Sequence, residues 1–245
     1  MPPFSRRAFT AGAAAIAAAG LSGCAGSGRS LPFADNGALD WLPFGQGGAR
    51  RDLNPTLARP HYGQIYGRME GEHYPVQAFR YMEVDAAFLR QEVAYTGLEG
   101  PGTIVVDPKS RFLYRVEDHQ RATRYGVGVG RDGFSWSGEA KINMKRDWPD
   151  WVPPHEMVAR NPEIRAELVA TSRGQGVPGG PKSPLGARAM YLFAGGGDTG
   201  YRIHGTTEPE TIGTNVSSGC IRLVNQDVIH LYHRTPEGAK VVVLA

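Results

Sequence analysis

Beyond Gly102 the sequence is a series of short apolar runs separated by residues that favour turns. The runs 103–107 and 111–116 flank Asp107-Pro108-Lys109-Ser110, a turn signal that predicts a β-hairpin. Further runs of this kind lie at 124–130, 136–144, 189–194, 201–204 and 240–244. The 33 glycines and 18 prolines among 245 residues agree with frequent turns rather than with a helical bundle. We therefore expect a mainly β fold, rich in strands and with minor helix.

The run 124–130 alternates glycine with larger residues. Closely spaced glycines also occur in phosphate-binding loops, but no Lys-Ser/Thr pair follows here and no helix begins. We therefore interpret the run as a strand whose glycines allow another backbone segment to approach closely.

Two helices are expected at the ends of the strand-rich region. One covers residues 86–93, with Asp85 as its N-cap. The other begins at Asn225, also a suitable cap, and places Val228, Leu231 and Tyr232 on one buried face. This arrangement leaves His230 and His233 facing outward.

An insertion rich in proline and tryptophan begins at Trp148. Its prolines favour the starts of helices over 154–158 and 162–169. Two interpretations remain open: Trp148 and Trp151 form a lid or groove wall over an extended substrate, or the insertion is a rigid surface excursion.

The N-terminus indicates export. Arg6 and Arg7 precede a short, weakly apolar run, as in a twin-arginine signal, and Leu21-Ser22-Gly23-Cys24 resembles a lipoprotein processing box. We expect a signal peptide over 1–23 and an envelope or periplasmic protein tethered to a membrane by lipid on Cys24; the alternative is an ordinary signal peptide with an incidental cysteine. A tether over 24–60 and an N-terminal extension over 61–99 that packs on the catalytic domain would follow, with the catalytic domain over 100–245.

Charge and ligand spacing exclude two classes of function. Without Arg6 and Arg7, 25 basic residues face 24 acidic ones, so nucleic-acid binding receives no electrostatic support. His61 and His73 stand alone, without the partners that a metal site needs, and are interpreted as surface or structural residues. We therefore expect no metal site at these histidines.

Cys220 is the candidate nucleophile. It lies in Ser-Ser-Gly-Cys, and lipid on Cys24 would leave no second cysteine for a disulfide. A thiol with a pKa of about 8.5 needs a base or positive charge nearby to react at neutral pH. His204, at the end of the run 201–204, can take the proton, and Arg222 can hold anionic charge. A buried structural cysteine beside an unrelated histidine is the alternative.

These residues resemble the L,D-transpeptidase family with the YkuD-type catalytic domain. The resemblance rests on the segments His204–Thr206 and Ser217–Arg222, and it extends to 102–107, 184–186 and 238–243. The chain departs from the family at Ser218, where many members have a second histidine.

The resemblance implies a β-sandwich of mixed sheets capped by a helix, and a peptidoglycan L,D-transpeptidase that needs no metal and no organic cofactor. Cys220 would attack the L-centred third residue of a tetrapeptide stem and release D-Ala, with His204 as base and the Gly205 carbonyl orienting its imidazole. The expected oxyanion and substrate-binding residues are Gly219, Ser218, Ser217, Arg222 and Tyr201.

The acceptor and the activity itself have alternatives. The acyl group would pass to a second stem, giving a 3-3 cross-link, or to a lysine of an envelope protein. A cysteine hydrolase of the same bonds and a non-catalytic peptidoglycan-binding lipoprotein remain the competing hypotheses.

Overall fold

The structure is a computed structural model that describes residues 62–118, 120–130, 136–217 and 219–245, with the backbone alone at 216 and 217. The expected signal peptide, Cys24 and the tether lie outside the described residues, as do His61 and Ser218. Among the described helices, none is long and apolar enough to cross a membrane.

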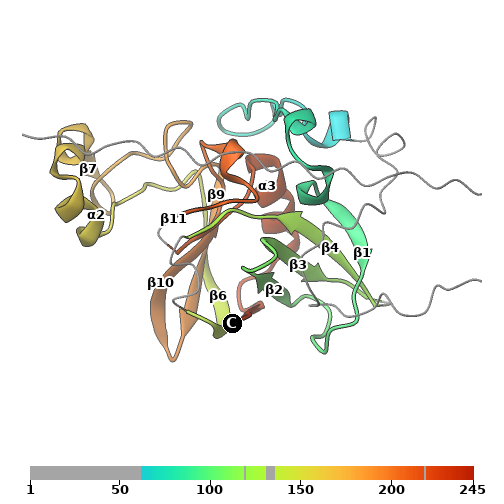
Figure 1. The fold of residues 1–245 in the computed structure, drawn as a ribbon. Helices are drawn as coiled ribbons and strands as arrows, with labels where there is room; N and C mark the ends of the chain where they lie inside the picture. The colour runs from blue at the N-terminus through green and yellow to red at the C-terminus, as the bar shows by residue number, and fades with distance from the viewer. Residues whose placement is uncertain (1–61, 119, 131–135, 218) are drawn as a thin grey trace, which may run out of the picture. The chain divides into compact units, whose positions relative to one another are not determined.

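Nine strands form one mixed sheet in the order β1-β4-β3-β2-β13-β6-β9-β10-β12 (Figure 1). They are β1 (Gln91–Ala94), β2 (Ile104–Asp107), β3 (Phe112–Val116), β4 (Arg121–Gly126), β6 (Gly138–Asp147), β9 (Arg188–Ala194), β10 (Gly197–His204), β12 (Ile221–Arg222) and β13 (Lys240–Val243). The pairs β2–β13 and β10–β12 are parallel, and the other pairs are antiparallel. The prediction of a mainly β fold with mixed sheets and few helices is confirmed.

The segment that follows β4, near one end of the sheet, meets β12 at the other end. Gly128, just after β4, exchanges two backbone hydrogen bonds with Arg222 of β12, at 2.9 and 2.8 Å. Next to this contact, β5 (Val129–Gly130) pairs in parallel with β11 (Asn215–Ser217). A Cβ atom on Gly128 would lie 2.7 Å from the carbonyl oxygen of Thr211, so the expected close backbone approach at this glycine is confirmed. The sheet thus curls around a single interior.

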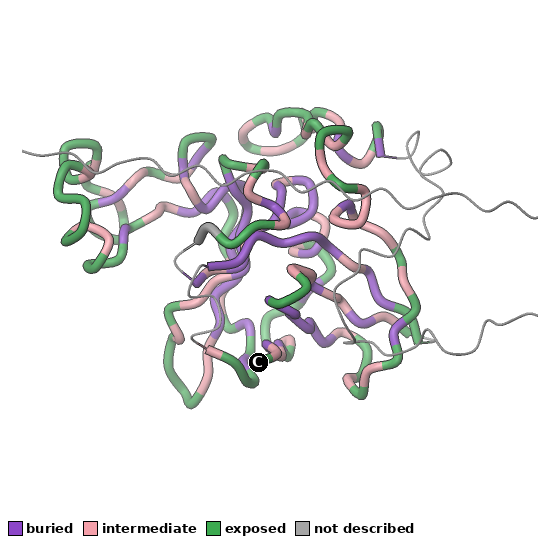
Figure 2. The backbone as a smooth tube through the Cα atoms, in the orientation of Figure 1, coloured by how far each residue is buried: buried purple, intermediate pink, exposed green. Residues whose placement is uncertain are grey.

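That interior is filled by apolar side chains from the sheet and from α3 (Asn225–Arg234). Leu113 and Tyr125 from one end of the sheet pack in the same cluster as Ile203 from the other end, and Val228 and Leu231 of α3 complete it. Figure 2 shows the buried central strands and the exposed outer loops. Burial of this kind stabilises by roughly 25 cal/mol per Å² of apolar surface.

Local signals predicted several elements correctly. The hairpin around Asp107–Ser110 forms, with Ile104 opposite Arg115 and Asp107 opposite Phe112. The strands expected near 189–194, 201–204 and 240–244 are present as β9, β10 and β13. Short apolar runs bounded by turn residues suffice here; β2 and most of β9 are buried on both faces, as expected of continuous apolar runs.

The predicted helix over 86–93 is wrong. Only a 3-10 turn, η2 (Ala86–Phe88), forms there, with the Asp85 carboxylate accepting from the Ala87 N–H as predicted for a cap. Residues 91–94 instead become β1, which pairs with β4. Tertiary pairing overrides helix propensity in so short a segment.

The insertion contains α2 (His155–Arg160), η3 (Pro162–Glu167) and a two-stranded ribbon of β7 (Val169–Thr171) and β8 (Gly174–Gly176). The first helix was predicted, but the second is a 3-10 helix that gives way to a strand at 169. The insertion extends to one side of the sheet (Figure 1). It contacts the sheet through Arg173 Nη1, which donates to the Tyr191 hydroxyl at 2.7 Å.

The N-terminal extension lies on the first turn of α3. It includes η1 (Tyr81–Glu83). The Tyr66 hydroxyl donates to Asp227 at 3.1 Å, and Gln226 Nε2 donates to the Gln77 carbonyl at 2.8 Å. Asp227 is buried and its pKa is raised to about 7, mainly by that burial, while the positive charge of Arg90 lowers it. Buried polar contacts of this kind anchor the extension to α3.

The prediction that α3 leaves both of its later histidines outward is half correct. His233 is exposed, whereas His230 is half-buried and its Nδ1 lies 2.7 Å from the Tyr125 hydroxyl. Burial lowers the pKa of His230 to about 3. The register of the apolar residues did not reveal this partner, which comes from β4. His73 is exposed, as expected.

Candidate active site

The two candidate catalytic residues are positioned by neighbouring parallel strands. In the pairing of β10 with β12, Ile203 lies opposite Ile221 and His204 opposite Arg222. The backbone continues this contact beyond the strands, since Leu223 N–H donates to the His204 carbonyl at 2.9 Å. Ile203 and Ile221 are buried and fix both strands in the interior. Cys220, directly before β12, therefore lies beside the last residues of β10.

His204 is held in a defined orientation. Its side chain is buried, and Nδ1 lies 2.5 Å from the Gly205 carbonyl oxygen. Because a carbonyl oxygen can only accept, Nδ1 carries the proton in a neutral ring and Nε2 keeps its lone pair. Burial lowers the pKa of His204 to about 4, the Gly205 carbonyl raises it, and the positive charges of Arg222 and Arg202 lower it. The imidazole is thus a neutral base at physiological pH.

Cys220 is partly buried. Burial raises the pKa of its thiol, as does the carboxylate of Asp198. The backbone amide of Arg202 and the charges of Arg202 and Arg222 act in the opposite direction and favour the thiolate. Burial is the largest of these effects, so Cys220 is protonated at neutral pH until a base removes the proton.

Arg202 was not among the predicted site residues. Its guanidinium lies over the Tyr191 ring, 4.4 Å from the centroid, and forms two hydrogen bonds to Asp198, each 2.8 Å long. Strand alternation places its side chain on the same face as His204. That alternation is the sequence signal that points to it.

Arg222 contributes charge from the other strand. Its Nη1 forms an ion pair with Glu208 at 2.9 Å. Its backbone is fixed on both sides, by Gly128 and by the β10 pairing. Arg222 is therefore a fixed positive charge near His204 and Cys220, as their pKa values indicate.

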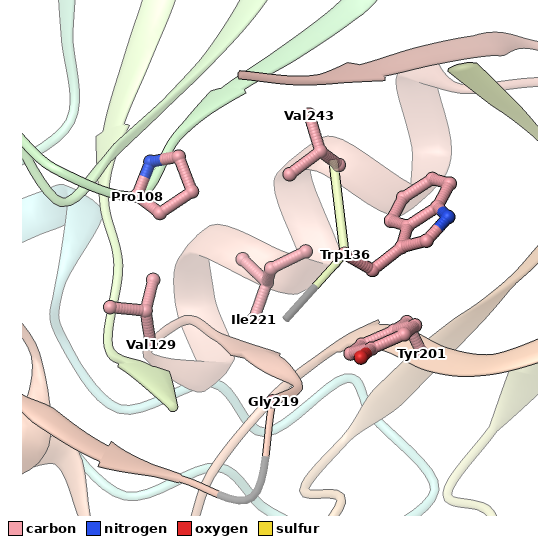
Figure 3. Close-up of a pocket in the computed structure, with 7 residues that line it drawn as sticks. All are labelled: Pro108, Val129, Trp136, Tyr201, Gly219, Ile221 and Val243. Carbon is pink, nitrogen blue, oxygen red and sulfur yellow. The ribbon is translucent and has the colours of Figure 1, made fainter. Parts of the chain in front are cut away.

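A small hollow lies next to Gly219, the residue before the candidate nucleophile (Figure 3). It is lined by Pro108, Val129, Trp136, Tyr201, Gly219, Ile221 and Val243. Trp136 and Tyr201 stack with ring centroids 5.7 Å apart. Gly219 has φ +112, and a Cβ atom there would lie 2.8 Å from the Tyr201 ring. Glycine at this position thus permits both the backbone conformation and the ring contact.

The structure therefore brings six of the eight predicted catalytic and substrate-binding residues to one end of the sheet. They are Cys220, His204, Gly205, Gly219, Arg222 and Tyr201. Ser217 belongs to β11, but its side chain and Ser218 lie outside the described residues. Within the described ranges, no group of three His, Cys, Asp or Glu side chains is placed to hold a metal ion.

Comparison with known proteins identifies the family. Residues 101–243 match the family model of the YkuD L,D-transpeptidase catalytic domain. The chain belongs to this family. The match includes the whole described part of the sheet from β2 to β13, and with it Cys220 and His204.

Individual relatives support the same assignment. Over 144 residues the chain is 30% identical to the probable L,D-transpeptidase YbiS of Escherichia coli, with 57% of this chain and 43% of YbiS covered. Over 148 residues it is 32% identical to the putative L,D-transpeptidase YqjB of Bacillus subtilis, covering 60% and 73%. The chain thus spans less than half the length of YbiS.

A solved structure from Brucella melitensis is described as a probable carnitine operon oxidoreductase. It is 48% identical, covers 67% of this chain and 99% of its own, and has a TM-score of 0.45. That description applies to the Brucella protein; the family of this chain rests on the match over residues 101–243.

Proposed function

We propose that this protein is a cysteine-dependent peptidoglycan L,D-transpeptidase in which Cys220 is the nucleophile and His204 the base. The observation that carries the proposal is the parallel pairing of β10 with β12, which sets the cysteine loop beside a buried histidine whose Nδ1 is bonded to Gly205. Family membership supplies the reaction class.

In the first half-reaction the Cys220 sulfur attacks the carbonyl carbon of the third stem residue, and the thiol proton passes to Nε2 of His204. A C–S bond forms as the C–N bond to D-Ala breaks. The same proton then passes from His204 to the departing amine, so D-Ala leaves and a thioester remains. Gly219 and Cys220 N–H groups are the proposed donors to the oxyanion.

The protonation states favour a concerted transfer over a preformed ion pair. Burial leaves His204 neutral and Cys220 protonated at neutral pH. The positive charges of Arg202 and Arg222 disfavour an imidazolium but stabilise negative charge on sulfur. The proton is therefore transferred during attack, when the stem carbonyl is in place.

In the second half-reaction an amine attacks the thioester and gives a proton to His204; the amide C–N bond forms as the C–S bond breaks, and His204 returns the proton to the Cys220 sulfur. A side-chain amine of a second stem gives a 3-3 cross-link; an envelope-protein lysine would give a protein-linked stem. The stacked rings of Trp136 and Tyr201, which line the hollow next to Gly219, are proposed to contact an apolar part of the stem.

We further propose that the protein works in the cell envelope, where its polymer lies. The support is the twin-arginine-like segment and the processing box that ends at Cys24. Labelling cells with a radioactive fatty acid tests this: label on the wild type but not on Cys24→Ser supports the lipid anchor, and equal label on both contradicts it.

The proposed activity is tested by incubating the full chain with disaccharide-tetrapeptide and analysing products by mass spectrometry. Wild type is expected to release D-Ala and form 3-3 dimers, and Cys220→Ala and His204→Gln to form none. Cys24→Ser serves as the matched cysteine control and should retain activity. Hydrolysed stems without dimers would assign a hydrolase, and no covalent chemistry at all would leave a binding protein; either result overturns transpeptidation.

A further inference from the structure

Asn225 was predicted to cap α3, and the structure shows a different role for its side chain. The helix begins without any side-chain cap. The amide turns instead toward the strand ends: Oδ1 accepts from the Ala187 N–H at 2.9 Å, and Nδ2 donates to the Thr206 carbonyl at 3.1 Å. These two bonds join the beginning of α3 to the segments just before β9 and just after β10.

Two glycines leave the space for this amide. A Cβ atom on Gly205 would lie 2.2 Å from Asn225 Oδ1, and one on Gly186 would lie 2.3 Å from the same atom. Contacts that short do not occur, so both positions must lack a side chain while Asn225 occupies its place. Gly186 also has φ +63, a conformation that favours glycine. Glycine at both positions is thus required for the Asn225 amide to fit.

The two hydrogen bonds of the Asn225 amide, which we call the clamp, act next to the peptide that orients His204. Gly205 N–H donates to the Arg188 carbonyl at 3.0 Å, which fixes the peptide before Gly205. Asn225 fixes the carbonyl of Thr206, after it. With both flanking peptides held, the Gly205 carbonyl points at His204 Nδ1. We propose that Asn225 is a positioning residue that sets the tautomer of His204 by clamping the Gly205–Thr206 backbone.

The inference deepens the proposed function, since it rests on His204 acting through Nε2. Asparagine suits the clamp because one side chain must both accept and donate. An aspartate in its place would lack the donor, and an apolar residue would lack both groups, leaving the Thr206 carbonyl without its bond. The ring could then rotate and take its proton on Nε2, the nitrogen that has to accept the thiol proton.

The neighbouring residue provides a matched control. Gln226 is also a buried amide in the first turn of α3, but its Nε2 donates to the carbonyls of Gly67 and Gln77 in the N-terminal extension. Replacing Gln226 should therefore destabilise the protein without disturbing the site.

The test is nitrogen NMR of ¹⁵N-histidine-labelled full chain, with the His204 signals assigned by loss in His204→Gln. Wild type is expected to carry the proton on Nδ1. Asn225→Leu should move the His204 signals toward the Nε2–H form and slow D-Ala release at least tenfold with KM within twofold, whereas Gln226→Leu should lower Tm and leave tautomer and kcat unchanged.

A folded Asn225→Leu protein with the wild-type tautomer and rate would overturn the inference, as would an equal tautomer change in Gln226→Leu. If Asn225→Leu does not fold, Asn225→Asp, which keeps the acceptor for Ala187 and loses the donor for Thr206, is read in the same way. The tautomer is measured without substrate. If the wild type releases no D-Ala but Asn225→Leu shows the expected tautomer shift, the proposed function is refuted and the role of Asn225 is not.

Discussion

Replacing His204 by glutamine is expected to remove a specific part of the pH dependence of stability. The imidazole is buried, and its pKa falls from 6.5 to about 4 in the folded chain. The unfolded chain therefore binds the proton more readily between these two pH values. The contribution of His204 to the unfolding free energy is complete above pH 6.5 and is lost as the pH falls toward 4.

The size of the effect follows from the difference between the two pKa values. At about 1.4 kcal/mol per pH unit, the interval from 6.5 to about 4 corresponds to about 3 kcal/mol of unfolding free energy. Glutamine is polar and similar in length but does not titrate in this range. His204→Gln is thus expected to lose about 3 kcal/mol less than wild type on acidification, whatever its stability at neutral pH.

Urea unfolding followed by circular dichroism at pH 7, about 5.5 and about 4 measures the difference. His233→Gln, an exposed histidine on α3, is the control and should follow wild type. The reasoning fails if His204→Gln and wild type lose the same unfolding free energy over this range.

Three further outcomes are expected. The rate of acylation by a stem should be constant from about pH 5 to 8 because His204 is already neutral. The rate of Cys220 alkylation by iodoacetamide should instead rise about tenfold per pH unit, as expected for a mostly protonated thiol. The same pH dependence for both rates would contradict this. Gly219→Ala, at φ +112 and facing the Tyr201 ring at 2.8 Å, should lower the unfolding free energy by about 1–3 kcal/mol in urea titration, and an unchanged midpoint would refute the strain. Burial raises the pKa of Asp227 to about 7. As the pH rises from 4 to 7, the wild type should therefore lose unfolding free energy relative to Asp227→Asn. Thermal melts in which the Tm of both proteins changes equally with pH would contradict this.

The strands and the candidate pair were predictable because their signals are local. The hairpin over 103–116, for example, is indicated by its own apolar runs and turn residues. Cys220 and His204 were selected as candidates because thiol chemistry requires a base and because their surrounding segments resemble a known family. Neither inference needed to know which distant strands meet.

The features that the sequence did not reveal depend on contacts between distant segments. Residues 91–94 are a strand because β4 is available to pair with them, and His230 is half-buried because Tyr125 reaches it. Asparagine is a favoured helix cap, yet the Asn225 amide bonds instead to Ala187 and Thr206, on two loops that meet only in the folded chain. Capping propensity is worth about 1 kcal/mol, which such tertiary bonds outweigh.

The central claim is that Cys220 becomes acylated by a stem peptide with release of D-Ala. It is tested most directly by trapping the full chain with a tetrapeptide stem whose side-chain amine is acetylated, so that no amine acceptor is present, and mapping the adduct by peptide mass spectrometry. We predict the mass of the stem minus its terminal D-Ala on the peptide that contains Cys220, and none on Cys220→Ala or on the peptide that contains Cys24. Release of D-Ala at the wild-type rate from Cys220→Ala would contradict the account.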